Sequence, residues 1–220
     1  MGRQTQTRER LVRTAAELFW SRGYAQTGVS SIMKHARATS GSFYHFFPTK
    51  DDLLLAALDA AGEQLEAEVL DRAESASPDL AGRIAVVIRV YRERTSPTAP
   101  GFGFPIGRLV GELGPDHIAA RRRVDETLDN LVSRIAGWLA ESSGSRLNET
   151  SRRRFAEFVV SAIEGAAVVA SVRGSTEPFE TCATQLALHI GLLVDGAHRR
   201  AGEVPPPIAS NDLAADWKAW

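Results

Sequence analysis

Apolar residues recur three and four positions apart along most of the chain, which is the spacing of one face of an α-helix. In the first such segment, about residues 7–22, Leu11, Ala15, Leu18 and Phe19 share a face, and Gly23 follows as a stop signal. Sustained alternation of apolar and polar residues, which marks half-buried strands, is weak throughout. The pattern therefore predicts an all-α protein.

The same spacing predicts a series of further helices, separated by Pro and Gly positions. Pro48 ends one short helix, and Thr49 then caps a long one whose first turn holds Asp51 and Asp52. A Pro- and Gly-rich stretch at 95–107 is expected to be an apolar loop. The expected helices are 29–36, 40–46, 50–74, 79–94, 106–113, 115–141, 151–173 and 178–201.

The chain divides into three parts by pattern and composition. Residues 1–50, the head, hold a predicted three-helix domain, and residues 51–202 hold a larger helical domain. Residues 203–220 contain a run of prolines at 205–207 and form a tail that is either disordered or docked through its tryptophans.

Charge separates the head from the rest of the chain. Residues 1–50 contain eight Lys and Arg against two acids, whereas the remainder has 18 against 25, although the whole chain is at only -1. A basic end on an acidic body is typical of a protein that meets a polyanion at one end. The single cysteine, Cys182, allows no internal disulfide and fits a reducing compartment. With no apolar leader and no apolar run of membrane-spanning length, the sequence predicts a soluble cytoplasmic protein.

The segment at 39–50, Thr-Ser-Gly-Ser-Phe-Tyr-His-Phe-Phe-Pro-Thr-Lys, is the most informative in the chain. It combines a short polar helix, a cluster of aromatic residues, a Pro break and the start of a new helix at Lys50. It follows two predicted helices, which is where a helix-turn-helix unit ends. Such a unit places a short helix in the major groove while flanking groups hold phosphates.

These residues resemble the N-terminal domain of TetR-family transcriptional regulators. The match runs over 15–19, 22–24, 27–32 and 39–47, and it ends at Lys50. The resemblance implies a helix-turn-helix domain followed by a variable helical domain that binds a small-molecule effector and forms a homodimer. Two positions depart from the family pattern. Arg37 stands where the family usually has Gly, at a cost of about 1 kcal/mol if the position needs a positive φ, and Phe46 stands where a second polar residue is common.

The expected DNA contacts follow from the chemistry of this segment. Small hydroxyl side chains at the start of the short helix suit contacts with base edges, which can be direct, can be bridged by water, or can include thymine methyl groups. Gly41 lets the backbone approach the duplex. Tyr44, His45 and Lys50 suit phosphates, the last together with the helix start, and Ser30 and Arg37 are expected to do likewise. The predicted DNA-binding set is Ser30, Arg37, Thr39, Ser40, Gly41, Ser42, Tyr44, His45 and Lys50.

The larger domain carries weaker signals. The segment 101–109 is similar to one in a drug-responsive subgroup of the family, in which Gly-x-Pro-Ile-Gly precedes an apolar helix. Aromatic and polar residues near it predict an effector site, although each also fits an ordinary core. The predicted ligand-binding set is Tyr91, Phe102, Phe104, Arg108, His117, Trp138 and Phe158. The Arg runs at 121–123 and 152–154 are interpreted as solvated helix surfaces.

The last two long helices carry small residues and an apolar stripe, which predicts a two-fold dimer that presents two heads to a palindromic operator. The favoured hypothesis is a repressor released from DNA by a small, largely apolar effector. A ligand-gated activator, or a helical ligand-binding or protein-interaction module without specific DNA binding, fits the same pattern. An enzyme is disfavoured because we find no nucleophile–base pair, no metal-ligand spacing around His45 and no P-loop Lys, so no metal, cofactor or membrane partner is expected.

Overall fold

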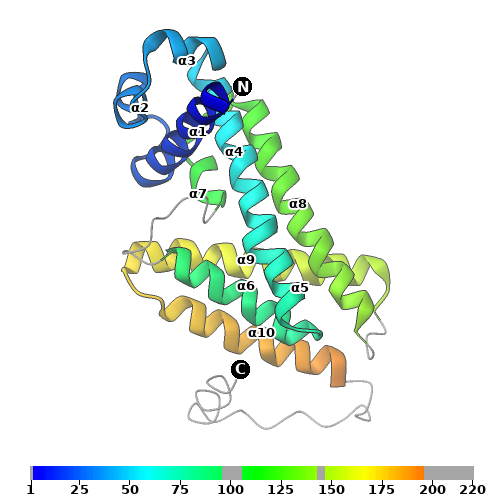
Figure 1. Ribbon diagram of the computed structural model, residues 1–220. Helices are drawn as coiled ribbons and strands as arrows, with labels where there is room; N and C mark the ends of the chain where they lie inside the picture. The colour runs from blue at the N-terminus through cyan, green and yellow to red at the C-terminus, as the bar shows by residue number, and fades with distance from the viewer. Residues whose placement is uncertain (1, 96–105, 143–146, 196–220) are drawn as a thin grey trace.

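The computed structural model describes residues 2–95, 106–142 and 147–195. Within these ranges the chain forms α-helices and one π-helical segment without any strand, which confirms the predicted all-α class (Figure 1). In chain order the elements are α1 Gly2–Arg22, α2 Val29–His35, α3 Ser40–Phe46, α4 Lys50–Leu65, η1 Glu66–Asp71, α5 Arg72–Ala76, α6 Leu80–Thr95, α7 Ile106–Val110, α8 Ile118–Glu141, α9 Glu149–Arg173 and α10 Glu177–Asp195.

The three head helices lie together at one end of the molecule (Figure 1). The predicted stripe of α1 is buried, and Gly23 ends the helix at φ 92, a conformation that suits glycine. The start of α1 was predicted too late, because the helix begins at Gly2 rather than near residue 7. Its first two turns are largely polar and exposed, so hydrophobic spacing gives no signal there.

Side-chain caps set the starts of the two helices that follow the helix-turn-helix turn. The Thr39 hydroxyl accepts a hydrogen bond from the Ser42 backbone N–H, and α3 begins at Ser40 as predicted. Thr49 and Asp52 form a reciprocal capping box at the start of α4. Each such cap contributes about 1 kcal/mol. Together they orient α3 between two well-defined turns.

A long helical rod, which consists of α4, η1 and α5, leads from the head into the rest of the molecule (Figure 1). The sequence predicts one uninterrupted α-helix that ends near residue 74, and the structure corrects this. The rod ends at Ala76 and contains six residues, Glu66–Asp71, in π-helical conformation. Hydrophobic spacing cannot separate an i→i+5 turn from an α-turn, and such turns are frequent at functional positions.

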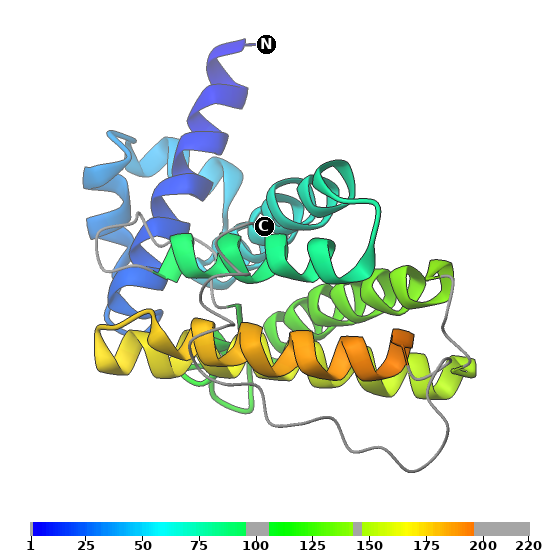
Figure 2. The same ribbon diagram turned by 90° about the horizontal axis from the view of Figure 1, so that it is seen from below.

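The remaining helices differ from the predictions mainly at their ends. The α8 helix begins at Ile118 rather than at Pro115, because the His117 backbone N–H first closes a turn onto the Gly114 carbonyl. The α7 helix ends at Val110, three residues early, and α9 begins at Glu149 behind an Asn148 cap. The predicted end of α10 at 201 lies outside the described residues. Figure 2 shows α9 and α10 side by side, and these two helices are in contact.

Two hydrophobic clusters form the core. The head cluster combines α1–α3 with the first half of α4, with α7 and with the start of α8, and it includes Phe43, Leu58, Leu109 and Val124. The body cluster joins the rest of the rod to α6, α8, α9 and α10. The division predicted at residue 50 therefore cuts through the head cluster, whose packing continues along α4.

The α9 helix has the length and the apolar composition of a membrane span, with a mean hydropathy of 1.7 over its best window. One such helix is weak evidence, because core helices of soluble proteins have the same composition. Here Val159, Ile163 and Ala167 on α9 are buried in the body cluster. The apolar composition of α9 is therefore accounted for in part by its packing inside the protein.

Candidate nucleic-acid interface and body cavity

The α3 helix is anchored on one face and exposed on the other. Phe43 is fully buried and Phe47 nearly so, whereas Tyr44 is 55% exposed. The Tyr44 ring packs edge-on against Phe43 with 5.1 Å between ring centroids, so its hydroxyl end is presented to the outside on a packed base. His45 is also exposed and packs against Phe46 at 4.9 Å. Both predicted phosphate ligands therefore lie on the open face.

The small residues at the start of α3 form a polar surface. Thr39 Oγ1 and Ser42 Oγ lie 2.9 Å apart in a hydrogen bond, which orders both hydroxyls. Ser40 and Gly41 are exposed, and a Cβ placed on Gly41 would meet nothing within 4 Å. Packing within the described chain therefore does not require a residue without a side chain at position 41. The absence of a side chain there leaves room for another molecule to approach the helix.

Arg37 adopts φ 49, which is the left-handed conformation that the family pattern implies for this position. The turn around it is held by a hydrogen bond from Arg10 Nε to the Ala36 carbonyl, at 2.6 Å, and by one from the Ala38 N–H to the Met33 carbonyl. The Arg37 side chain is exposed, as is that of Ser30 at the start of α2. The strained turn therefore places an unburied cation beside α3.

The Lys50 side chain contacts Tyr24 of the protein itself, whereas the sequence predicts that it contacts a DNA phosphate. Its Nζ donates to the Tyr24 carbonyl at 2.6 Å and lies 3.9 Å from the centroid of the Tyr24 ring. Burial lowers the pKa of Lys50, while the charge of Asp51 opposes this shift. In this structure the amine fastens the start of α4 to the turn between α1 and α2, so a phosphate contact by Lys50 remains a prediction.

Two further residues join the interface, and hydrophobic patterning missed them. Gln4 and Thr7, on the first turns of α1, line a hollow together with Gly41, Ser42 and His45 of α3. Gln4 precedes the predicted helix and Thr7 is its first residue, and both are polar, so nothing in the sequence pattern placed them beside α3. A duplex seated on α3 would pass close to this hollow.

The head is tied to the rest of the molecule through Tyr24. Its backbone N–H donates to Glu112 Oε2 at 2.9 Å, and its hydroxyl donates to Asp51. Burial, followed by the hydrogen bond and the charge of Asp51, raises the pKa of Tyr24. His117 packs against the Tyr24 ring at 5.3 Å, with its Nε2 3.8 Å from Asp51 Oδ1. His117, predicted as a ligand-binding residue, therefore lies at this junction.

The other predicted ligand-binding residues do not converge on one site. Tyr91 is fully buried and donates to Glu164 Oε1 at 2.9 Å, while Trp138 is 2% exposed and donates to Glu74 Oε1 at 2.7 Å. Phe158 is 45% exposed. Phe102, Phe104 and the side chain of Arg108 lie outside the described part of the structure. Tyr91 and Trp138 therefore each pack in the core with a different acidic partner.

Glu164 is the notable acid of the body. It accepts from the Tyr91 hydroxyl and, through Oε2 at 3.1 Å, from the Gly107 N–H, so it links α6, α7 and α9. Burial raises the pKa of this carboxyl, although its hydrogen bonds act in the opposite direction. Burial also raises the pKa of the Cys182 thiol to about 11.

A cavity of about 470 Å³ lies between α5, α6 and α10, and we call it the α6–α10 cavity. Its walls include apolar residues of α6 and α10, among them Val86 and Phe179, and two arginines, Arg89 and Arg92. Of the predicted ligand-binding residues whose side chains the structure describes, none lines it. Its volume is in the usual range for small-molecule sites.

Comparison with known protein families gives one match in the head and a second match in the larger domain. Residues 11–57 match the family described as "Bacterial regulatory proteins, tetR family". Residues 81–185 match "Transcriptional regulator LmrA/YxaF-like, C-terminal domain". These ranges contain the α3 surface and the α6–α10 cavity respectively, apart from the cavity residues of α5.

Individual proteins agree with these matches. The HTH-type transcriptional regulator YxaF of Bacillus subtilis is 33% identical over 107 residues, which is 48% of this chain and 56% of that protein. The HTH-type transcriptional regulator Rv0196 of Mycobacterium tuberculosis is 29% identical over 81% of this chain and 91% of its own length. The crystal structure of a TetR transcriptional regulator from Chloroflexus aurantiacus superposes with a TM-score of 0.77 at 28% identity, over 88% of this chain and 98% of that one. The chain is a member of the TetR family, a DNA-binding transcriptional regulator with a helix-turn-helix head.

Proposed function

We propose that the chain is a homodimeric repressor that binds a palindromic operator through α3 and is released by a small-molecule effector. The observation that carries the DNA part is the α3 surface, where anchored aromatic residues present Tyr44 and ordered hydroxyls on an open face. The surface is small and polar, so it suits base edges with phosphate contacts on both sides. Arg37 and His45 flank the hydroxyls and are exposed.

The dimer is proposed to form through α9 and α10. Phe158, Val168 and Val172 are 45, 46 and 83% exposed on α9, and Leu192 is 51% exposed on α10. These apolar side chains, with the exposed Gly165 between them, make a face that needs a cover. By contrast Leu186 and Ile190 of α10 are buried within the monomer. A two-fold dimer through this face would place two heads on half-sites about 34–36 Å apart.

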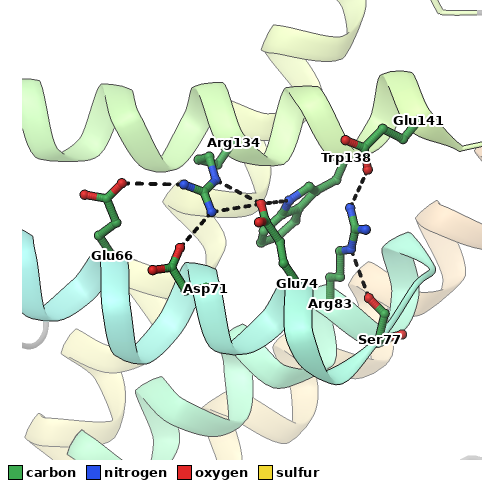
Figure 3. Close-up of polar contacts among 8 residues, drawn as sticks. All are labelled: Glu66, Asp71, Glu74, Ser77, Arg83, Arg134, Trp138 and Glu141. Carbon is green, nitrogen blue, oxygen red and sulfur yellow. Dashed lines mark hydrogen bonds and ion pairs between the residues drawn. The ribbon is translucent and has the colours of Figure 1, made fainter.

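The rod is proposed to carry the effector signal. It begins at Lys50 beside the DNA-binding helix and ends at Ala76 in the body. Arg134 of α8 binds Glu66, Asp71 and Glu74 of the rod at 3.5, 3.0 and 2.9 Å (Figure 3). Glu66 and Asp71 would point about 140° apart on an α-helix of 3.6 residues per turn, and the wider π-turn brings them to one side. The π-segment and the Arg134 clamp therefore fix the rotation of the rod against α8.

The DNA proposal is tested by selecting random duplexes with the purified protein and measuring affinity for the winner at two salt concentrations. We expect a palindromic sequence and a steep loss of affinity with salt. Tyr44→Ala should weaken binding to any duplex by roughly ten- to a hundredfold, since a hydrogen bond to a charged group is worth about 1.5–3 kcal/mol. Failure to enrich any sequence with folded dimeric protein would favour the interaction-module alternative. The position of the operator relative to a promoter would separate repression from activation.

The dimer proposal has its own test, by light scattering or sedimentation. Val172→Glu should give a folded monomer, because it buries a charge in the apolar face of α9. Ile118→Glu is a matched control, since Ile118 is 73% exposed but lies at the start of α8. A Val172→Glu protein that stays dimeric while Ile118→Glu dissociates would place the interface elsewhere.

A further inference from the structure

The α6–α10 cavity has an apolar wall and a cationic one. Val86, Phe179 and Ala183 supply aliphatic and aromatic surface, whereas Arg89 and Arg92 supply two guanidinium groups. Residues 82, 85, 86, 89 and 92 of α6 are spaced three and four apart, so one face of the helix lines the cavity. An apolar cavity with a few convergent polar groups is the usual form of a small-molecule site.

Arg89 is the unusual member of this wall. Its side chain is half-buried, and its Nε is buried without a hydrogen-bond partner among the described residues. Neither Arg89 nor Arg92 forms an ion pair with any acid in the described ranges. Arg83, on the same helix, differs, because it binds Glu141 and the Ser77 carbonyl at 2.6 and 3.0 Å (Figure 3). A buried guanidinium donor without an acceptor is costly unless something supplies one.

We infer that the α6–α10 cavity binds an organic anion with an apolar body, and that Arg89 and Arg92 hold its carboxylate or similar oxyanion. Two arginines face one lining acid, the exposed Glu180, so the wall carries a net positive charge. A planar carboxylate matches the guanidinium fork that each of these arginines carries. This inference gives the effector of the proposed function a site and a chemical class, and it rests on that proposal only where release from DNA is concerned.

The position of the cavity links it to the rod. Ala76 and Ser77, at the end of α5, line the cavity. Gly82 at the start of α6 packs so closely that a Cβ there would lie 2.1 Å from Ser77 Oγ. A ligand in the cavity would therefore press on the tightly packed end of the rod. Glu74, whose carboxylate contacts Arg134 and Trp138, lies in the last turns of the same rod (Figure 3).

The test uses the full-length protein with naphthalene-2-carboxylate and its neutral analogue naphthalene-2-carboxamide, titrated calorimetrically. These two rigid probes have nearly the same shape and differ in charge. We expect the carboxylate to bind at least about tenfold more tightly than the amide, since charge-assisted hydrogen bonds are about twice as strong as neutral ones. Equal affinities, or no binding of the carboxylate at millimolar concentration, would overturn the inference.

Variants locate the site. Arg89→Met should reduce carboxylate affinity about tenfold or more and leave amide affinity unchanged, while Arg89→Lys should restore part of it. Arg72→Met is the matched control, because Arg72 lies on α5 next to the cavity, is 51% exposed and does not line the cavity. If Arg89→Met does not fold, Ala183→Phe, which fills the cavity from α10, should abolish binding of both probes. Unchanged binding in either folded variant would show that the probe sits elsewhere.

Operator binding is measured in the same preparations, so that the two proposals fail separately. Carboxylate binding that depends on Arg89 but does not release DNA would support the site and contradict its role as the effector site. A protein that binds its operator but neither probe would leave the DNA proposal standing and overturn this inference.

Discussion

The DNA-binding surface and the α6–α10 cavity are built in opposite ways. Most of the surface comes from one stretch, residues 37–45, in which Arg37, Tyr44 and His45 are exposed and whose orientation is set by local caps. The cavity is assembled from residues near 76–92 and 179–183, on three helices that meet only in the fold. A local surface leaves a motif in the sequence, whereas a site assembled by packing leaves scattered residues that look like ordinary core or solvated charge.

The two regions also differ in what stabilises them, yet they share a boundary. The head cluster and the body cluster are distinct, and Leu128 of α8 packs against both. The rod passes from the first cluster to the second at about Leu65. The two clusters could therefore unfold as separate units or as one.

The largest expected effect comes from emptying one cluster at a time. Phe43 and Phe179 are both fully buried, one in each cluster, and Phe→Ala at such sites costs about 3–5 kcal/mol. Phe43→Ala should lose operator binding and expose the amides of α1–α3 to hydrogen exchange, with those of α9 still protected. Phe179→Ala should expose the amides of α10 and keep operator binding.

Native-state hydrogen exchange, measured by mass spectrometry, tests whether the two clusters unfold as separate units or as one. If both variants lose protection over the same helices and to the same extent, head and body form one cooperative unit. The distinction drawn between the two clusters would then hold for packing and not for stability.

The next effect sharpens the boundary between the regions, because Arg134 holds the rod that joins them. Arg134→Met removes three ion pairs to the rod and should lower the free energy of unfolding by about 1–2 kcal/mol, which is more than an isolated surface pair contributes. Arg153→Met is the control, since Arg153 also binds two acids, Asp129 and Glu157, but none on the rod. Urea unfolding measures both. Equal losses would show that the clamp is only surface charge.

Local rules predicted the head well. They gave the bounds of α3 and the Thr49 cap, because each depends on residues a few positions away. The family pattern, rather than a local rule, pointed to the left-handed conformation that Arg37 adopts. Local rules did not show that Lys50 would turn inward, since the carbonyl and ring of Tyr24 that it contacts lie 26 residues earlier. Long-range partners of this kind have no signature in periodicity.

In the body, hydrophobic spacing predicted the helices but not how they pack. The π-turn stayed hidden because apolar spacing continues through it, and aromatic residues chosen for a ligand site proved to serve the core at Tyr91 and Trp138. Arg89 and Arg92 were part of an unremarkable amphipathic helix in the sequence. Whether they pair with an acid depends on the helices packed around them, and among the described residues neither forms an ion pair.

A third prediction concerns the pH dependence of the body. Burial raises the pKa of Glu164 in the folded chain, so folding favours its protonated form. Its contribution to stability is therefore fully present below the unfolded value of about 4.3 and is lost as pH rises through the higher folded value. Glu164→Gln should abolish this loss, so its stability relative to the natural chain should improve between about pH 4 and pH 7.

Denaturant unfolding across that pH range provides the measurement. Glu157→Gln is the control, because Glu157 is exposed on the same helix and forms only a surface ion pair with Arg153. Parallel stability curves for the natural chain and Glu164→Gln would mean that the carboxylate is as well accommodated by Tyr91 and Gly107 as it is by water.

The smallest effect lies in the head, where one residue is expected to change stability and DNA binding in opposite directions. Arg37 holds φ 49, so Arg37→Gly should relieve left-handed strain, and after the added freedom of the unfolded chain it should raise stability by about 0.5 kcal/mol. The same change removes a cation beside α3 and should lower the salt dependence of DNA binding by about one phosphate contact. Lys34→Ala is the control, because Lys34 is exposed on α2 in ordinary helical conformation and carries charge without strain. A stabilised Arg37→Gly protein with an unchanged salt slope would show that the strain at this turn is kept for a reason other than phosphate binding. A weaker slope without added stability would show that the hydrogen bonds around Ala36 and Ala38 already absorb the strain.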